Sequence, residues 1–254
     1  MKSSRTIIFQ RIELKYYVSR SIRTALEKDL QAFIQPDAYT AKTGGYHIRS
    51  IYYDTPDMMT YHEKLSGNAK RHKLRVRVYG EDPTTTPFVR LEVKSRVNST
   101  IHKTTVDVPN EDYPAVEDAL HNHRALPEKF MHNKDVSQEF MRLKKQYNMI
   151  PQVLVQYQRK AYEKKGANRV RLTFDYALAG SRNLDLLGPL KGGREILRYG
   201  TSIFEIKVDG IMPFWLHKLI CKYDLQNQAI SKYCNCLRAF GHLSLRAREN
   251  DLVY

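Results

Sequence analysis

The feature that most constrains this chain is a regular alternation of charged and aliphatic residues in several short segments. Segments 13–15, 92–94 and 205–207 each read glutamate, aliphatic residue, lysine, and segments 74–79 and 169–173 alternate arginine with aliphatic residues. Residues two apart in a β-strand lie on one face, so each segment places its charges on one side of a sheet and its aliphatic residues on the other. The sequence therefore predicts several strands that share one strongly charged face.

The charge balance of the chain predicts an anionic partner. Its 254 residues include 42 Lys+Arg against 27 Asp+Glu, a formal net charge of +15. Net charge alone does not distinguish nucleic acid, anionic membrane, nucleotide and polyanion from one another. A chain of this length can bury a sizeable core, and no shift in composition marks a boundary. We therefore expect a single domain over residues 1–254.

Cysteine usage and hydropathy favour a cytoplasmic protein. No apolar run reaches the roughly 18 residues that a membrane span needs, and residues 1–5 lack the apolar core of a signal peptide. The cysteines at 221, 234 and 236 are too few for a disulfide framework, and the last two are poorly spaced for zinc. We expect no membrane span in the chain, and oligomeric state is left open.

Periodicity divides the chain into strands and flanking helices. The alternation predicts strands at 6–18, 46–54, 72–80, 87–97, 101–108, 153–163, 168–177 and 203–208. Helical spacing predicts helices at 19–34, 113–121, 136–147, 215–223 and 231–240. The aliphatic faces of the strands need cover, which the amphipathic helices can supply. We therefore predict an α+β fold: a closed antiparallel β-barrel with helices packed outside and charges lining its lumen.

The charged face is unusual because arginines two residues apart dominate it. For any one strand, a polar face in contact with water is an ordinary finding. Many like charges on one face repel each other unless a polyanion or interleaved carboxylates compensate them. We expect Asp107 and Asp175, which share the charged phase, to pair with arginines. Arginine and lysine suit phosphate oxygens, while a few carboxylates suit a divalent cation.

The order of the charged motifs resembles that of a known family, the VTC domain within the triphosphate tunnel metalloenzymes. VTC names the polyphosphate polymerase domain of vacuolar transporter chaperone proteins. The resemblance covers nearly the whole chain. It rests on Arg11-Ile-Glu-Leu-Lys-Tyr16, Ser50-Ile-Tyr-Tyr-Asp-Thr55, Lys73-Leu-Arg-Val-Arg-Val-Tyr79, Leu91-Glu-Val-Lys94, Tyr157-Gln-Arg159, Arg169-Val-Arg171, Phe204-Glu-Ile-Lys207 and Ser231-Lys-Tyr233.

The resemblance implies a role for each matching residue. The residues expected to act on the transferred phosphate are Arg75, Arg77, Lys94, Arg159 and Arg171. Those expected to bind substrate phosphates are Lys15, Arg11, Lys103, Tyr157, Lys207, Ser231 and Lys232. The resemblance further implies Mn²⁺ or Mg²⁺ as cofactor, with Glu205 as metal ligand and Glu13 and Glu92 as further candidates.

The activity that this implies is metal-dependent transfer of the γ-phosphoryl group of ATP to a growing inorganic polyphosphate chain. Two alternatives stay open: a triphosphatase of the same fold, and a non-enzymatic module that binds polyphosphate. Hydrolytic tunnel enzymes typically read Glu-x-Glu-x-Lys on the first strand, and Arg11 replaces the first of those glutamates here. This departure favours polymerase over hydrolase. Nucleic acid is not expected as a partner, because the basic residues alternate along strands rather than forming an exposed patch with stacking aromatics.

Overall fold

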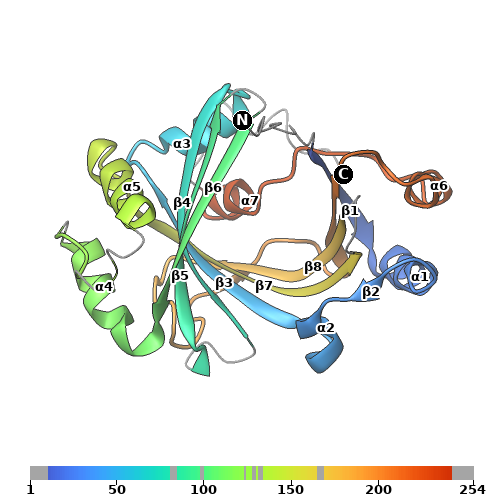
Figure 1. The fold of residues 1–254 in the computed structure, drawn as a ribbon, viewed down its shortest axis with the longest axis horizontal. Helices are drawn as coiled ribbons and strands as arrows, with labels where there is room; N and C mark the ends of the chain where they lie inside the picture. Colours follow the sequence, from blue (N-terminus) through green and yellow to red (C-terminus); the bar gives the residue numbers. More distant parts are fainter. Residues whose placement is uncertain are drawn as a thin grey trace, which may run out of the picture. The chain divides into compact units, whose positions relative to one another are not determined.

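A computed structural model describes residues 11–80, 85–97, 100–122, 124–127, 130, 134–164 and 169–241. Figure 1 shows the strands and helices along the chain. The strands are β1 (Arg11–Ser19), β2 (Gln35–Pro36), β3 (Tyr46–Asp54), β4 (Lys70–Tyr79), β5 (Phe88–Val97), β6 (Thr100–Pro109), β7 (Ile150–Lys164), β8 (Val170–Ser181), β9 (Arg194–Glu195) and β10 (Thr201–Asp209). The helices are α1 (Arg20–Leu30), α2 (Ala38–Thr43), α3 (Met59–Leu65), η2 (Asn110–Asp112), α4 (Tyr113–His121), α5 (Lys134–Gln146), α6 (Phe214–Lys222) and α7 (Lys232–Ala239).

The predicted α+β class and the antiparallel strand pairing are confirmed. Eight of the ten strands of the sheet follow the order β1-β10-β8-β7-β3-β4-β5-β6, and the other two lie off this path, β2 paired with β7 and β9 paired with β8. The pairs β1–β10, β10–β8, β3–β4, β4–β5 and β5–β6 are all antiparallel. Within the described residues the order is a path from β1 to β6, so backbone hydrogen bonds do not close the ring that the predicted barrel implies.

The described residues divide into two compact units, each made from three separate stretches of chain. Unit 1 contains the described residues up to Tyr46, together with Tyr157–Ala177 and Leu197–Ile230. Unit 2 contains His47–Gln156, Leu178–Ile196 and the described residues from Ser231 onward. Each unit has its own hydrophobic core.

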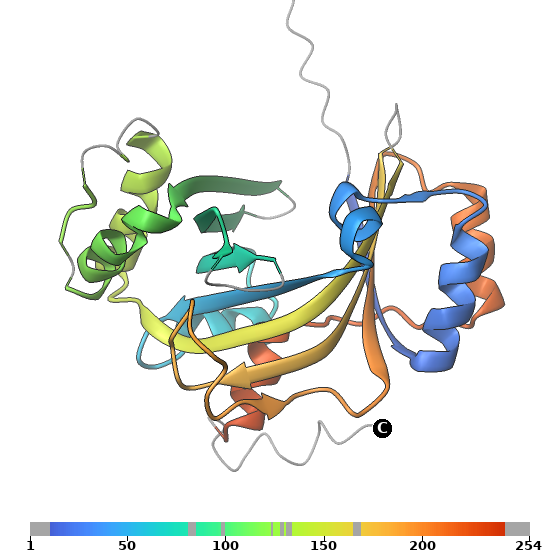
Figure 2. The same ribbon diagram turned by 90° about the horizontal axis from the view of Figure 1, so that it is seen from below.

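The core of unit 1 buries the aliphatic phase of β1, β8 and β10 under two helices. Leu172 and Ile206, which lie opposite each other on β8 and β10, are fully buried. Helix α1 contributes Leu26 to this core and α6 contributes Leu216. Figure 2 shows α1 and α6 side by side, as expected from the stacking of Phe33 on Trp215 with ring centroids 4.8 Å apart. Trp215 is thus a packing residue.

The core of unit 2 buries the aliphatic phase of β4, β5 and β6 under α4 and α5. Leu74, Leu91 and Val106 come from the three strands, while Val116 of α4 and Phe140 of α5 cover them. Figure 1 shows both helices on one side of these strands. Since every second residue of the strands faces these helices, the charged phase lies on the opposite face of the sheet.

The element boundaries differ from the predicted ones in a few places. Helix α1 ends at Leu30 rather than residue 34, because the chain turns there, with Phe33 and Ile34 donating back to the Leu30 carbonyl at 2.9 and 3.0 Å. The short helix α2 was not predicted, and α3 follows the turn and helix-start signal at Asp54-Thr55-Pro56. Residues 6–10 of the predicted first strand lie outside the described residues.

Candidate functional site

The charged face of unit 2 is ordered in rows across strands β4, β5 and β6. Lys73 lies opposite Lys94, and Lys94 lies opposite Lys103. We call these three residues the lysine row. Like charges directly opposite each other destabilise a sheet, and here Glu92 lies 3.5 Å from Nζ of Lys103 while the centroid of the Tyr52 ring lies 4.7 Å from Nζ of Lys73.

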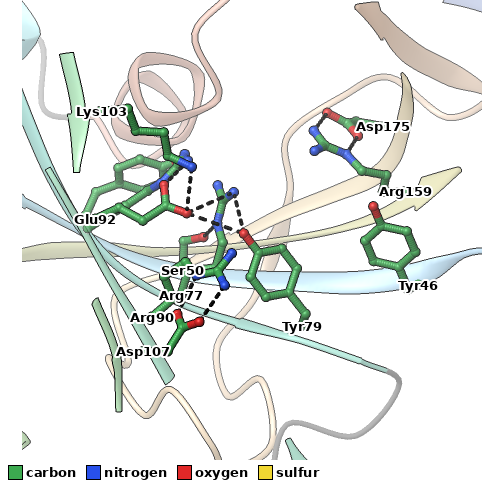
Figure 3. Close-up of polar contacts among 12 residues, drawn as sticks. Tyr46, Ser50, Arg77, Tyr79, Arg90, Glu92, Lys103, Asp107, Arg159 and Asp175 are labelled. Atoms are coloured by element: carbon green, nitrogen blue, oxygen red, sulfur yellow. Dashed lines mark hydrogen bonds and ion pairs between the residues drawn. The ribbon is translucent and has the colours of Figure 1, made fainter. Parts of the chain in front are cut away.

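The next row places a buried carboxylate between cations. Arg75, Glu92 and Thr105 lie opposite one another on the three strands, and Glu92 is 1% exposed. The Oε2 atom of Glu92 accepts hydrogen bonds from Nε of Arg75 at 2.7 Å and from its Nη2 atom. Its Oε1 atom lies 3.8 Å from Nη1 of Arg77 and 3.5 Å from Nζ of Lys103, and accepts a hydrogen bond from the Tyr79 hydroxyl at 3.3 Å (Figure 3).

The charges around Glu92 fix its ionisation state. Burial raises the pKa of Glu92, but Arg75, Arg77 and Lys103 outweigh that effect and lower the pKa to about 2. The carboxylate therefore stays ionised at neutral pH and holds the three basic side chains in place. Because the available oxygens already accept from these cations, Glu92 serves as an internal counter-ion in this arrangement.

Strand β3 adds two polar side chains to this face. Ser50 lies opposite Arg77 in register and accepts a hydrogen bond from its Nε at 3.0 Å. Tyr52 lies opposite Arg75 and accepts from its Nη1 at 3.2 Å. Burial raises the pKa of Tyr52, but the positive charges of Arg75, Lys73, Arg77 and Lys232 lower it by more. The pKa of Tyr52 is therefore about 7.

A further row on this face contains an arginine paired with a carboxylate. Nε and Nη2 of Arg90 donate to Asp107 at 2.5 and 2.7 Å. The expected pairing of Asp107 with an arginine is confirmed.

The start of helix α7 is held by a buried tyrosine. The hydroxyl of Tyr233 donates to Oδ2 of Asp54 at 2.6 Å, and Asp54 is fully buried. The same carboxylate accepts from the backbone N–H groups of Thr60 and Tyr61 at 2.8 and 3.0 Å, at the start of α3. The residue before α7, Ser231, caps it by accepting from the N–H of Cys234 at 3.3 Å. These bonds fix the position from which the predicted ligands Ser231 and Lys232 project.

A close approach at Gly180 also fixes α7. A Cβ atom at Gly180 of β8 would lie 3.1 Å from the sulfur of Cys236 and 3.1 Å from the Phe240 ring. A larger residue at this position would require the Cys236 and Phe240 side chains to shift by a few tenths of an ångström.

The charged face of unit 1 combines lysines and glutamates on β1 and β10. Lys15 lies opposite Glu205, and Glu13 lies opposite Lys207. The Nζ atom of Lys15 is 2.8 Å from Glu13 and 3.5 Å from Glu205, while Nζ of Lys207 is 3.0 Å from Glu205. Burial lowers the pKa of Lys15, but Glu205 and Glu13 raise it more, and the net shift is upward. For Lys207 the effect of burial is the larger one, and its pKa is lowered despite the opposing charges of Glu205 and Glu13.

Two arginines of unit 1 are held by buried carboxylates. Nε and Nη2 of Arg159 donate to Asp175 at 2.6 and 2.7 Å, so the expected pairing of Asp175 with an arginine is also confirmed (Figure 3). Arg171 donates to Asp37 at 3.0 Å, and Asp37 in turn caps helix α2 by accepting from the N–H of Thr40. Tyr157 lies under Arg159, whose guanidinium carbon is 5.4 Å from the ring centroid.

Comparison with known families identifies the chain. The family model described as VTC domain matches residues 10–240. This chain belongs to the VTC domain family. Comparison with curated protein sequences finds no significant match.

Solved structures are similar to this VTC domain at low sequence identity. A candidate adenylyl cyclase from Hippeastrum, described as having a dominant triphosphatase activity, aligns with a TM-score of 0.50 and 14% identity over 92% of this chain and 98% of that one. A candidate adenylate cyclase from Bacillus halodurans aligns with a TM-score of 0.47 and 14% identity over 91% and 98% of the two chains. At this identity, the Hippeastrum likeness concerns the fold alone. No helix among the described residues is long and apolar enough to cross a membrane.

The structure distributes the predicted site residues of the VTC domain between the two units. Unit 2 brings together Arg75, Arg77, Glu92, Lys94 and Lys103 on one sheet face, with Ser231 and Lys232 at the start of α7. Unit 1 carries Glu13, Lys15, Tyr157, Arg159, Arg171, Glu205 and Lys207. The backbone of Arg11 pairs with Asp209, but its side chain lies outside the described residues. That both sets line one lumen stays a prediction.

Several residues of these faces received no role from the sequence. Ser50, Tyr52 and Lys73 lie in the motifs that carry the family resemblance and in the charged phase of β3 and β4, but no function was assigned to them. Thr173 of β8 shares the phase of Arg171 and Asp175, but only the strand pairing shows that it lies opposite Glu205. Asp37 caps helix α2 and accepts a hydrogen bond from Arg171, and it does not belong to any of the alternating segments.

The carboxylates of unit 1 fit a divalent cation. No group of three or more His, Cys, Asp and Glu side chains among the described residues is placed to hold a metal ion. However, Mg²⁺ commonly binds through one or two carboxylates, with water and substrate phosphates completing its shell. Glu13 and Glu205 already converge on one cation, the ammonium group of Lys15. Their oxygens are the hard ligands that Mg²⁺ and Mn²⁺ prefer.

Proposed function

We propose that this VTC domain is an ATP-dependent polyphosphate polymerase. The observation that carries the proposal is the lysine row of unit 2 beside Arg75 and Arg77, whose guanidinium groups are held by Glu92 and Ser50. A row of three opposed ammonium groups suits a ligand with closely spaced negative charges, and an inorganic polyphosphate chain has one on every phosphate.

The proposed reaction joins the γ-phosphoryl group of ATP to the terminal oxygen of a polyphosphate chain. A new P–O–P bond forms, the bond between the β- and γ-phosphates breaks, and ADP leaves. Such transfers need in-line positioning and charge neutralisation rather than a protein nucleophile. Preoriented basic groups are effective because they do not reorganise as charge develops.

Individual residues receive roles from their placement. Arg75 and Arg77 bind phosphate oxygens in orientations set by their hydrogen bonds to Glu92 and Ser50. Lys94 and Lys103 neutralise neighbouring phosphates. The lysine in the first strand, Lys15, does the same on the face of unit 1.

The remaining predicted residues act on the face of unit 1 and at α7. Arg159 and Arg171 are held by Asp175 and Asp37 and bind phosphate, with Tyr157 and Lys207 beside them. Ser231 and Lys232 bind phosphate at the start of α7, where a helix N-terminus favours anions.

Glu205, assisted by Glu13, would hold Mn²⁺ or Mg²⁺. A bound divalent cation neutralises charge on the transferring phosphates. Glu92 accepts hydrogen bonds from both Nε and Nη2 of Arg75, so we assign it the role of counter-ion to that arginine. We propose a cytoplasmic location for the reaction, with ATP and inorganic polyphosphate as its partners.

A triphosphatase is the second candidate. It is favoured by the shared fold with the Hippeastrum protein that is described as a triphosphatase. This activity would transfer the phosphoryl group to water in place of polyphosphate. A polyphosphate-binding module without turnover is the third candidate.

One experiment separates the three candidates. Purified protein is incubated with ATP and Mn²⁺, and products are resolved by gel electrophoresis alongside assays of ADP and free phosphate. A polymerase yields long polyphosphate with matching ADP, and chelation of the metal abolishes both. Free phosphate without polymer would select the triphosphatase.

Matched variants test the binding-only candidate. For a module without turnover, Glu205→Gln leaves polyphosphate binding nearly intact, Arg75→Ala or Arg77→Ala removes it, and none of the proteins releases ADP. For the polymerase, Glu205→Gln abolishes polymer formation in a protein that still binds the product.

A further inference from the structure

A buried threonine lies beside the proposed metal ligand. In the pairing of β10 with its two neighbours, Glu205 lies opposite Lys15 of β1 on one side and opposite Thr173 of β8 on the other. Directly opposed residues in an antiparallel pair lie on the same face, with Cβ atoms about 4.5–5.5 Å apart. The Thr173 side chain therefore lies on the charged face, next to the Glu205 carboxylate.

The hydroxyl of Thr173 has no hydrogen-bond partner among the described residues. Thr173 is 2% exposed, and its Oγ1 atom is one of a few buried side-chain polar atoms that lack such a partner. The others belong to helices α1, α3, η2 and α7. Thr173 is thus the one in this group that lies on a strand of the charged face.

An unsatisfied buried hydroxyl costs about 1–3 kcal/mol relative to a satisfied one. A valine has nearly the same shape and would avoid this cost. A threonine at such a position is therefore explained by a ligand that uses the hydroxyl oxygen.

The neighbours of Thr173 narrow the kind of ligand. Glu205 is a hard anionic oxygen donor. The other proposed metal ligand, Glu13, lies on β1, the strand that pairs with β10 on the side away from β8. Asp175, two residues along β8, is committed to Arg159 through two hydrogen bonds. A neutral hydroxyl next to a carboxylate is a donor pair that Mg²⁺ and Mn²⁺ accept, as in phosphate-binding loops where a Ser or Thr hydroxyl contacts Mg²⁺.

We propose that Oγ1 of Thr173 is a ligand, together with Glu205, of the divalent cation. This inference rests on the proposed metal-dependent function and adds to it a ligand from β8. Thr173 keeps its proton when it binds, so it adds an oxygen donor without adding charge. The cation then contacts strands β8 and β10 through directly opposed residues.

The test compares Thr173→Val with Thr173→Ser. Binding of Mn²⁺ alone is measured by the loss of the free-ion electron paramagnetic resonance signal, and stability is measured by urea denaturation. We expect Thr173→Val to weaken Mn²⁺ binding on the order of tenfold and to be at least as stable as the wild type. Thr173→Ser, which keeps the hydroxyl, is expected to bind Mn²⁺ within a few-fold of the wild type.

Several results would overturn the inference. Equal Mn²⁺ affinity in the wild type and Thr173→Val would do so. So would weaker tripolyphosphate binding in Thr173→Val with Mn²⁺ affinity unchanged, since the hydroxyl would then bind phosphate. These outcomes are separate from failure of the proposed function, which is read from the products that the wild type makes from ATP.

Discussion

Arg159 and Asp175 form a two-pronged ion pair between neighbouring positions on β7 and β8, with Nε–Oδ1 and Nη2–Oδ2 distances of 2.6 and 2.7 Å. Asp175 is fully buried, and the Arg159 side chain is only 12% exposed. An arginine held in this way presents its remaining N–H groups in one direction, which suits recognition of a phosphate.

Replacing Asp175 should therefore affect both stability and ligand binding. We expect Asp175→Asn to lower the free energy of unfolding by about 3–5 kcal/mol, because it leaves a buried arginine without its counter-ion. Urea denaturation measures this loss. The control is Asp118→Asn, which breaks an exposed ion pair with Arg124 and should cost less than about 1 kcal/mol. A loss no larger than in the control would contradict the assigned role of Asp175.

Glu92 should make stability depend on pH in the acid range. Its pKa of about 2 in the folded protein lies below the ordinary value of 4.5, so its stabilising effect is complete above pH 4.5 and is lost as pH falls toward 2. The shift corresponds to about 3 kcal/mol. Glu92→Gln should therefore destabilise the protein at neutral pH, and the difference from the wild type should shrink steadily between about pH 5 and pH 2.

The measurement for Glu92 is urea denaturation at several pH values. Glu111→Gln, at an exposed glutamate, serves as the control and should stay within about 0.5 kcal/mol of the wild type. A constant difference between Glu92→Gln and the wild type at all pH values would show that the buried carboxylate is not the titrating group.

Tyr52 should ionise near neutral pH. Its pKa of about 7 compares with an ordinary value of 10.0, so near-ultraviolet absorbance should show one tyrosinate forming around neutrality in the wild type and none in Tyr52→Phe. Tyr39→Phe, at an exposed tyrosine, is the control and should keep this step. Because the lowered pKa belongs to the folded state, the wild type should also gain stability over Tyr52→Phe as pH rises from about 7 to 10.

A bound polyanion should reverse this shift. Tripolyphosphate neutralises the charges of Lys73, Arg75 and Arg77, so it should raise the pKa of Tyr52. If the neutral-pH step persists unchanged in the presence of saturating tripolyphosphate, the anion binds elsewhere.

Tyr233 should control the order of helix α7. Tyr233→Phe removes the 2.6 Å hydrogen bond to Asp54 and leaves a buried carboxylate oxygen with one donor fewer, at a cost of about 1–3 kcal/mol. We expect faster amide hydrogen exchange in residues 232–239, with exchange in α1 unchanged. Uniform acceleration across both helices would instead indicate global destabilisation.

The local structure of the sheet could be predicted because the alternation of residues within each strand shows which side chains lie on which face. Leu74, Val76 and Val78 are buried in the core, while Arg75 and Arg77 lie on the opposite phase, as their spacing indicates. The pairing of Asp175 and Asp107 with arginines followed from the same phase. These features depend on neighbours two residues apart, which a sequence displays directly.

Features set by distant residues could not be predicted. Asp54 accepts a hydrogen bond from Tyr233, 179 residues away along the chain, and Asp37 accepts one from Arg171, 134 residues away. Closure of the barrel depends on the register of the two end strands, and an alternation of period two fits many registers equally well. The role of Thr173 depends on which residue faces it across β10, which requires the strand pairing.

The lysine row has a consequence for handling the protein. The three lysines lie opposite one another in register, and any multivalent anion that binds there stabilises the folded state. A ligand at a hundred times its dissociation constant adds about 2.7 kcal/mol to apparent stability. Melting temperatures of this VTC domain will therefore vary with phosphate-containing buffers and with polyanions carried over from cell extracts. Variants should be compared only after identical purification and in the same buffer.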